Sequence, residues 1–197
     1  MAPGSGKTRT VIALIDVLMR AGWVKRVLFM ADRVALVNQA VNAFKAHLPH
    51  SSPVNLVTEK TGEGRVFLST YSTMMNLIDE RKGGTARFGP GHFDLVVIDE
   101  AHRSVYQRYG AIFDYFDSLL VGLTATPREE IDRNTYGLFD LEESVPADAY
   151  SLDQAISQEW LVPPVAVSQP LKFVQEGIRY DDLWSCPIKT EHDQISV

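Results

Sequence analysis

The stretch Leu95-Val96-Val97-Ile98-Asp99-Glu100-Ala101-His102 decides the fold. Its first four residues are apolar and mostly β-branched, which predicts a strand buried on both faces, as in a parallel sheet covered by helices. Two adjacent carboxylates then end the strand. A buried sheet tolerates such charges only at its edge, where open α/β sheets bind their ligands. The stretch therefore predicts a site for a cationic or metal-bridged ligand.

A second motif stands at the start of the chain. Residues 1–8, Met-Ala-Pro-Gly-Ser-Gly-Lys-Thr, match the phosphate-loop pattern G-x-x-x-x-G-K-[ST], except that Met1 occupies the position of the first glycine. Backbone N–H groups of such a loop curl around phosphate oxygens, the lysine adds a point charge, and the threonine hydroxyl reaches Mg²⁺. The predicted nucleotide-binding residues are Gly4, Ser5, Gly6, Lys7, Thr8 and Arg9.

The two motifs together predict one reaction centre. Asp99 is expected to hold, from its strand, the Mg²⁺ that Thr8 also reaches, and Glu100 to orient or deprotonate the attacking water. Lys7, Asp99 and Glu100 are therefore the candidate catalytic residues, with a nucleoside triphosphate and Mg²⁺ as the expected ligands. The alternative is a glycine-rich helix start and a strand that happens to end in acids.

Composition and charge narrow the class of protein. The 197 residues are 45% hydrophobic and 22% charged, enough for one well-cored domain and an appendage. The single cysteine, Cys186, excludes an internal disulfide and fits a reducing cytoplasm. No apolar run is long enough to span a bilayer and no signal-peptide pattern is present, so we expect a cytoplasmic protein without a membrane partner.

Charge is distributed unevenly along the chain. Residues 1–110 hold 14 Lys and Arg against 9 Asp and Glu, whereas residues 111–197 hold 5 against 16. A basic first part is compatible with a phosphate-backbone partner, and the acidic part would face away from it.

Predicted strands alternate with predicted helices, which favours an α/β, doubly wound, mostly parallel sheet. Strands are expected at 27–30, 54–57, 66–68, 95–98 and 119–123, and helices at 8–21, 34–48, 73–80, 107–116 and 152–160. Residues 81–91 are glycine-rich and basic and predict a surface loop. Four strands end in polar pairs that would share one sheet edge, although such residues also cap helices. The pairs are Asp32-Arg33, Ser69-Thr70, Asp99-Glu100 and Thr124-Thr126.

A phosphate loop should follow a central strand, but the chain begins at the loop, which leaves a gap in the predicted sheet. We therefore expect a piece of a longer protein, or a gene product truncated at its start. Residues 1–146 are predicted to form a nucleotide-binding domain that lacks its first strand. Residues 147–197 are predicted to form a helix and a linker.

Three motifs, in their order along the chain, resemble those of the superfamily 2 helicases and translocases. They are the loop at 4–8, the D-E-A-H at 99–102 and the T-A-T at 124–126. Three further segments look like the motor part of the R (restriction) subunit of type I restriction enzymes. They are V-L-F-M-A-D-R at 27–33, S-T-Y-S-T-M at 69–74 and I-D-E-A-H-R-S at 98–104. The tail from 150 to 164 is similar to the exit from the first motor domain of that group. The resemblance implies that residues 1–146 are a RecA-like first motor domain, a P-loop NTPase. It also implies that residues 147–197 are an exit helix and a linker towards a second motor domain.

The resemblance also implies roles for individual residues. Lys7, Thr8, Asp99 and Glu100 would keep the roles given above. His102, Thr124 and Thr126 would link the nucleotide state to DNA contacts, and Arg33, Ser69 and Thr70 would touch the DNA backbone. A surface ion pair is the alternative for Arg33, and a buried imidazole is the alternative for His102. The implied partners are double-stranded DNA and the specificity and modification subunits of a restriction complex.

The expected function is the ATP-binding part of an ATP-dependent DNA translocase or helicase, a DNA-dependent ATP hydrolase within a type I restriction endonuclease. The nuclease domain and the second RecA-like domain with its arginine fingers are missing from the sequence, so the chain alone should hydrolyse ATP very slowly. The alternatives are a general superfamily 2 DNA or RNA helicase domain and a non-catalytic nucleic-acid-binding remnant. Neither the N-K-x-D of GTPases nor the L-S-G-G-Q of ABC ATPases occurs.

Overall fold

The computed structural model describes residues 1–59, 62–82, 84–99, 103–124, 139 and 147–165. The chain divides into two compact units, Met1–Val162 and Pro163–Val197. Nearly all the described residues belong to the first unit, and residues 147–162, which the sequence grouped with the linker, lie in it. No helix within these ranges has the length and apolar character needed to span a membrane.

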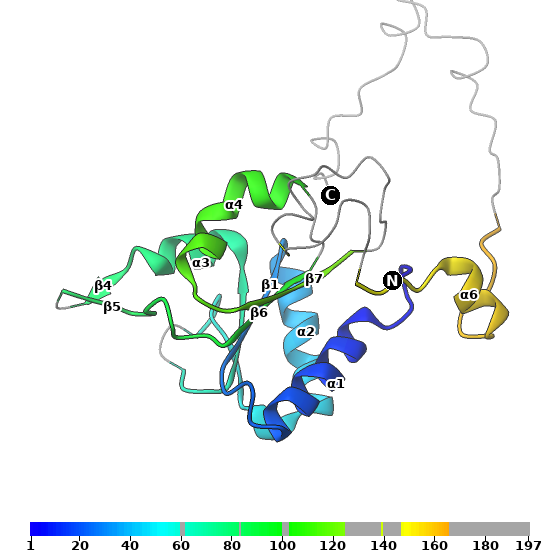
Figure 1. Ribbon diagram of the computed structural model, residues 1–197, viewed down its shortest axis with the longest axis horizontal. Helices are drawn as coiled ribbons and strands as arrows, with labels where there is room; N and C mark the ends of the chain where they lie inside the picture. Colours follow the sequence, from blue (N-terminus) through cyan, green and yellow to red (C-terminus); the bar gives the residue numbers. More distant parts are fainter. Residues whose placement is uncertain (60–61, 83, 100–102, 125–138, 140–146, 166–197) are drawn as a thin grey trace, which may run out of the picture. The chain divides into compact units, whose positions relative to one another are not determined.

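A parallel five-stranded sheet forms the centre of the first unit (Figure 1). Its spatial order is β2 (Pro53–Asn55), β3 (Val66–Thr70), β1 (Val27–Ala31), β6 (Leu95–Asp99) and β7 (Leu119–Leu123). Helices α1 (Lys7–Arg20) and α2 (Val34–His47) cover one face, and α3 (Tyr71–Ile78) and α4 (Arg103–Tyr115) cover the other. The predicted α/β, doubly wound architecture is confirmed.

Alternate residues of each strand enter two separate apolar cores. On the side of α1 and α2, Phe29 of β1 meets Phe44 of α2 edge to face, with ring centroids 5.9 Å apart. On the side of α3 and α4, Phe67 of β3 meets Phe93, with ring centroids 5.5 Å apart. All five residues of β1 are buried, as expected for a central parallel strand covered on both faces.

The helices begin and end where local chemistry requires. Gly22 adopts a φ of 75° directly after α1, a conformation that costs an L side chain energy, and so it terminates the helix. The Thr70 side chain accepts a hydrogen bond from the Thr73 N–H and caps α3. Ser151 and Gln154 form a capping box at α6 (Leu152–Ser157).

Several elements differ in extent from the sequence prediction, and three of them illustrate why. The predicted loop at 81–91 contains a short antiparallel ribbon, β4 (Arg81–Lys82) and β5 (Thr85–Ala86), because Gly84 at a φ of 85° allows a tight turn. Strand β3 continues through Ser69 and Thr70 because both pair within the sheet. Helix α6 ends at Ser157, short of the predicted 160, because Glu159 adopts a φ of 62°.

Strand β7 occupies one edge of the sheet and is less buried than the strands inside it. Leu95 of β6 and Leu119 of β7 are partners in register, yet Leu95 is 1% exposed and Leu119 is 59% exposed. Among the described residues, no strand pairs with the second edge of β7. The end of this edge strand lies beside the first residues of the chain, as described below.

Candidate nucleotide-binding site

The register of the strands brings their carboxyl ends to one edge of the sheet. Ala31 pairs with Thr70, Met30 with Ile98, and Asp99 with Leu123. The polar pairs that the sequence placed after four strands therefore begin at a common edge, where parallel α/β sheets bind their ligands.

The phosphate loop is folded by two glycines and one serine. Gly4 and Gly6 have φ values of 77° and 89°, in the left-handed region that favours glycine. The N–H and the hydroxyl of Ser5 both donate to the Ala2 carbonyl, over 3.3 and 2.7 Å. The loop thus closes on itself through its own backbone before α1 begins at Lys7.

The start of α1 offers suitable chemistry for phosphate. Gly6 occupies the N-cap position and makes no side-chain cap hydrogen bond to the helix. The first turn contains no acidic residue, and Lys7 and Thr8 are half-buried while Arg9 is exposed. The N–H groups of a helix start, the positive end of the helix and a lysine together fit an anionic, phosphate-bearing group.

The chain start lies against the end of β7. The Met1 amino nitrogen donates to the carbonyl of Thr124 over 3.1 Å, and Thr124 follows Leu123, the register partner of Asp99. The loop therefore begins at the strand adjacent to the acidic strand end. Of the predicted site residues, Glu100, His102 and Thr126 lie outside the described residues.

Asp99 is the last residue of β6 and is half-buried. Its backbone carbonyl accepts a hydrogen bond of 2.7 Å from the hydroxyl of Tyr71, the first residue of α3. The sequence analysis did not single out Tyr71, since a tyrosine at the start of an apolar helix looks like an ordinary core residue.

Ser69 and Thr70 were predicted to contact DNA, but both side chains are buried, with exposures of 0% and 4%. The Ser69 hydroxyl donates to the Thr70 carbonyl, and the Thr70 hydroxyl donates to the Thr73 hydroxyl while it caps α3. Neither side chain presents surface to a ligand in this structure. Thr70 thus caps α3 in this structure, and contact of Ser69 and Thr70 with DNA stays a prediction.

Arg33, the third predicted DNA contact, is placed differently. Its side chain is 81% exposed just before α2, and its Nε lies 3.9 Å from an Asp32 carboxylate oxygen. An exposed ion pair of that length contributes little, so Arg33 is accessible to an external partner.

Two residues beyond the predicted motifs contact the phosphate loop. The Tyr150 carbonyl accepts a hydrogen bond of 2.9 Å from the Ala2 N–H. A Cβ built on Gly4 would lie 3.6 Å from Leu161 Cδ2. The sequence pattern gave no signal for these contacts, because more than 140 residues separate them along the chain.

A separate charged cluster lies at the amino ends of the strands, opposite the candidate site. Asp94, before β6, accepts hydrogen bonds of 2.8 Å from the backbone N–H groups of Lys25 and Arg26. Burial alone would raise the pKa of Asp94, but these bonds and the two cations hold that pKa below its ordinary value. Burial, and next the Arg26 charge, lower the pKa of His92.

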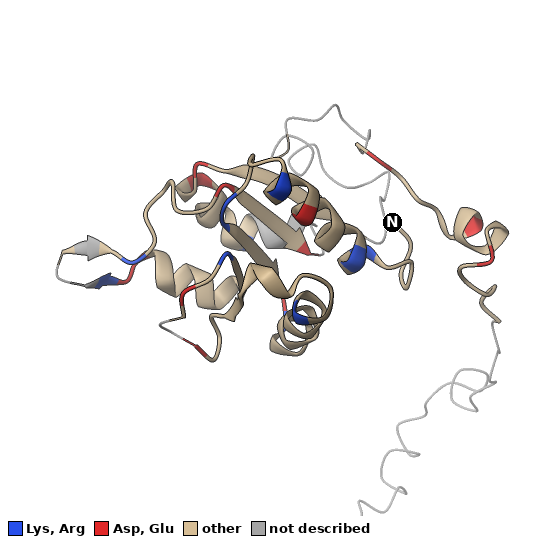
Figure 2. Cartoon of the chain, turned by 90° about the horizontal axis from the view of Figure 1, so that it is seen from below, with Lys and Arg blue, Asp and Glu red and all other residues tan. Residues whose placement is uncertain are grey.

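The uneven charge predicted along the sequence is only partly visible. Lys and Arg are interspersed with Asp and Glu over the described part (Figure 2). Only 5 of the 16 acidic residues in 111–197 are described, so the predicted separation of a basic and an acidic surface stays a prediction.

A parallel α/β sheet with a phosphate loop and an acidic strand end at one edge defines a P-loop nucleotide-binding domain. Residues 1–129 match the family model described as "Type III restriction enzyme, res subunit" (ResIII), and the chain belongs to this family.

Curated relatives place the chain more narrowly. It is 34% identical over 185 residues to the type I restriction enzyme EcoAI endonuclease subunit of Escherichia coli, over 91% of this chain and 22% of the relative. It is 27% identical over 211 residues to the EcoKI endonuclease subunit of E. coli K12, over 90% of this chain and 17% of the relative. The chain thus spans about a fifth of the length of these relatives.

Solved structures share the fold. A fragment of a putative HsdR subunit of a type I restriction enzyme from Vibrio vulnificus YJ016 aligns with a TM-score of 0.56 and 25% identity, over 79% of this chain and 26% of that one. The Hef helicase domain of Pyrococcus furiosus aligns with a TM-score of 0.53 and 22% identity, over 72% and 32%. The resemblance to a superfamily 2 helicase-like motor domain of the type I R subunit is confirmed.

Proposed function

We propose that this chain is the ATP-binding part of an ATP-dependent DNA translocase, the first motor domain of the R subunit of a type I restriction endonuclease. The observation that carries the proposal is the contact of the loop start with Thr124, one strand from Asp99. In that arrangement one bound nucleotide would contact both the phosphate loop and the acidic end of β6.

The proposed roles are those that the motifs and the family resemblance imply. The amides of residues 4–8 would surround the phosphates, and Lys7 would neutralise their outer charge. Thr8 and Asp99 would hold Mg²⁺, which lowers the charge on the phosphates when it is bound. Glu100 would orient the attacking water. His102, Thr124 and Thr126 would relate the state of the site to DNA.

Double-stranded DNA is the proposed partner, and Arg33 is the proposed contact with its backbone because the guanidinium is exposed. One structural neighbour, the type ISP restriction-modification enzyme LlaGI, was solved with a DNA substrate mimic. Specificity and modification subunits and a cytoplasmic location complete the proposal by analogy with the relatives.

The test is a titration of a fluorescent ATP analogue with and without Mg²⁺. Lys7→Ala should weaken binding at least about tenfold, since a hydrogen bond to a charged group contributes roughly 1.5–3 kcal/mol. Lys45→Ala is the control, because Lys45 is an exposed lysine near the end of α2. Equal binding by the parent and Lys7→Ala would favour the non-catalytic remnant instead.

A second measurement separates a motor part from a complete enzyme. The arginine finger of an NTPase contributes about 10³–10⁵ in rate, and these 197 residues contain no Q-x-x-G-R-x-x-R pattern that would supply one. The chain should therefore bind MgATP but hydrolyse it very slowly. Fast, DNA-stimulated hydrolysis by the purified chain would contradict the proposal.

A further inference from the structure

Tyr71 joins two elements that the proposed function treats separately. It is the first residue of α3, follows the helix cap Thr70 directly, and is 1% exposed. Its hydroxyl donates to the backbone carbonyl of Asp99 over 2.7 Å, across 28 positions of sequence. A buried phenol normally requires a hydrogen-bond partner, and here that partner belongs to the candidate Mg²⁺ ligand.

The Tyr71 hydroxyl acts at the carboxyl end of β6. Among the described residues, the pairs between β1 and β6 extend to Met30 and Ile98, and those between β6 and β7 extend to Asp99 and Leu123. The Tyr71 hydroxyl therefore adds a contact from α3 to the strand end at Asp99.

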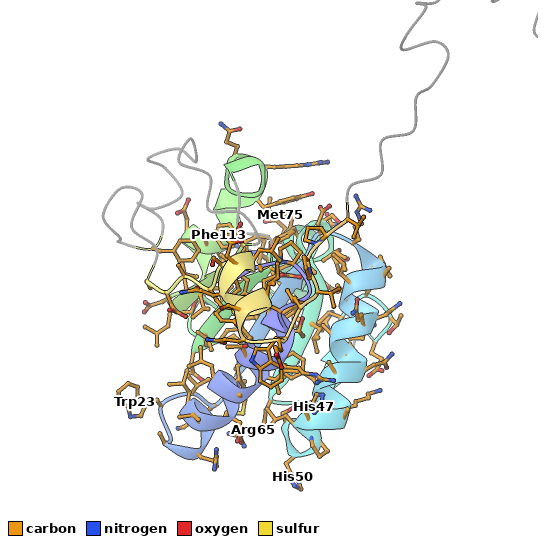
Figure 3. The ribbon with its side chains drawn as sticks, turned by 90° about the vertical axis from the view of Figure 1, so that its right-hand side faces the viewer. Trp23, His47, His50, Arg65, Met75 and Phe113 are labelled. Carbon is orange, nitrogen blue, oxygen red and sulfur yellow. The ribbon has the colours of Figure 1, made fainter. Side chains whose placement is uncertain are left out.

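The Tyr71 ring is itself held in place by α4. It stacks on the ring of Tyr109, with ring centroids 5.3 Å apart and ring planes inclined by 17°. The Arg108 guanidinium lies over the Tyr109 ring, 5.4 Å from its centroid. Met75 of α3 and Phe113 of α4, labelled in Figure 3, belong to the same apolar cluster. Helix α4 begins at Arg103, directly after the D-E-A-H motif.

We propose that Tyr71 is a positioning residue for Asp99: through its hydroxyl, α3 fixes the end of β6 so that the Asp99 carboxylate keeps its place towards Mg²⁺. The inference rests on the proposed function, because it assigns Asp99 to the metal. Groups that orient a metal ligand commonly affect metal affinity about 10–100-fold when they are removed. Tyr71 acts through Asp99 and touches no reacting atom.

The chain offers a matched control for this bond. Tyr115, the last residue of α4, is half-buried and donates its hydroxyl to the Phe88 carbonyl over the same 2.7 Å. Tyr71→Phe and Tyr115→Phe therefore each remove one hydroxyl from one backbone carbonyl and keep the ring. A general loss of stability should appear in both variants.

The readout is the gain in affinity for a fluorescent ATP analogue on addition of Mg²⁺, measured on the full 197-residue chain. We expect Tyr71→Phe to reduce this gain about tenfold while affinity without Mg²⁺ stays within about twofold. Tyr115→Phe should keep the full gain, although both variants should melt at a lower temperature than the parent. Tyr109→Phe should keep the gain, and Tyr109→Ala should lose part of it because the stack is removed.

Two results would overturn the inference. One is an unchanged Mg²⁺-dependent gain in Tyr71→Phe, and the other is an equal loss in Tyr71→Phe and Tyr115→Phe. Both are distinct from failure of the proposed function, in which the parent chain and Lys7→Ala bind MgATP equally poorly. That outcome would remove the proposed function and the inference with it.

Discussion

The Met1 amino nitrogen and the Thr124 carbonyl are hydrogen-bonded over 3.1 Å, although 123 positions separate them in the sequence. This bond attaches the phosphate loop to the end of β7. Because β7 is paired with β6 up to Asp99, the loop and the acidic strand end share one edge. Neither motif by itself requires the two to lie close together, so their proximity results from the order of the strands in the sheet.

Replacing Gly6 should separate backbone strain from ligand binding. Gly6 and Gly22 have φ values of 89° and 75°, and an added Cβ would meet nothing within 4 Å at either position. Gly6→Ala and Gly22→Ala should each cost about 1–2 kcal/mol of stability, because an L residue is strained there. Only Gly6→Ala should also weaken nucleotide binding. Urea unfolding and ATP-analogue titration of both variants test this, and equal binding by the two variants would contradict it.

The open edge of β7 predicts unequal effects at two paired leucines. Leu95→Ala should cost about 2–5 kcal/mol as a large-to-small change in the core. Leu119→Ala should cost less than about 1 kcal/mol, because its side chain is 59% exposed against 1% for Leu95. Urea unfolding measures both. A similar cost at Leu119 would mean that the edge is covered in solution, and size-exclusion chromatography would then show whether a second copy covers it.

Leu161 should affect the nucleotide through the loop. It lies near Gly4, whereas its neighbour Trp160 is 76% exposed. Leu161→Ala should weaken ATP-analogue binding about threefold to fivefold, equivalent to roughly 1 kcal/mol, because the loop loses apolar support. Trp160→Ala is the control and should bind as the parent does. A larger effect at Trp160 than at Leu161 would refute the packing argument.

Asp94 should make stability depend on pH in acid. Its pKa is held below the ordinary 3.8 by hydrogen bonds and cations that outweigh burial. The folded state then keeps the carboxylate ionised where the unfolded chain protonates it, so the stabilisation is present above about pH 4 and is lost as pH falls through the folded pKa. Asp94→Asn should melt lower than the parent at pH 7, and the difference should shrink at pH 3. A constant difference would contradict this assignment.

His92 should make stability depend on pH as well, in a higher pH range than Asp94. Burial and Arg26 lower the pKa of His92 from 6.5. Just below that pH, His92 is therefore protonated in the unfolded chain but still neutral in the folded chain. Stability should therefore fall as pH decreases from about 6.5 to the lower folded pKa, and level off beneath it. His92→Gln should flatten this part of the melting-temperature profile. His50→Gln is the control, at an exposed position labelled in Figure 3, and should leave the profile unchanged.

Much of the fold could be predicted from local pattern. The apolar run 95–98 and the stripe of α1 carry strand and helix periodicity, and β7 has the bounds predicted for it, Leu119–Leu123. The ribbon at 81–86 could not be predicted, because glycine-rich, basic residues fit a loop as well as a short hairpin. Thr70 shows the same limit: a hydroxyl after a strand suits a DNA contact and a helix cap equally, and only its 4% exposure favours the cap.

The sequence by itself determined the chemistry of the site, because a phosphate loop, an acidic strand end and their order are encoded in contiguous residues. The tertiary structure decided which distant residues support that chemistry. The sheet order sets Thr124 against Met1, and helix packing sets the Tyr71 hydroxyl on the Asp99 carbonyl. Such contacts depend on how strands are ordered and how helices cover them, and no periodicity of neighbouring residues records that arrangement.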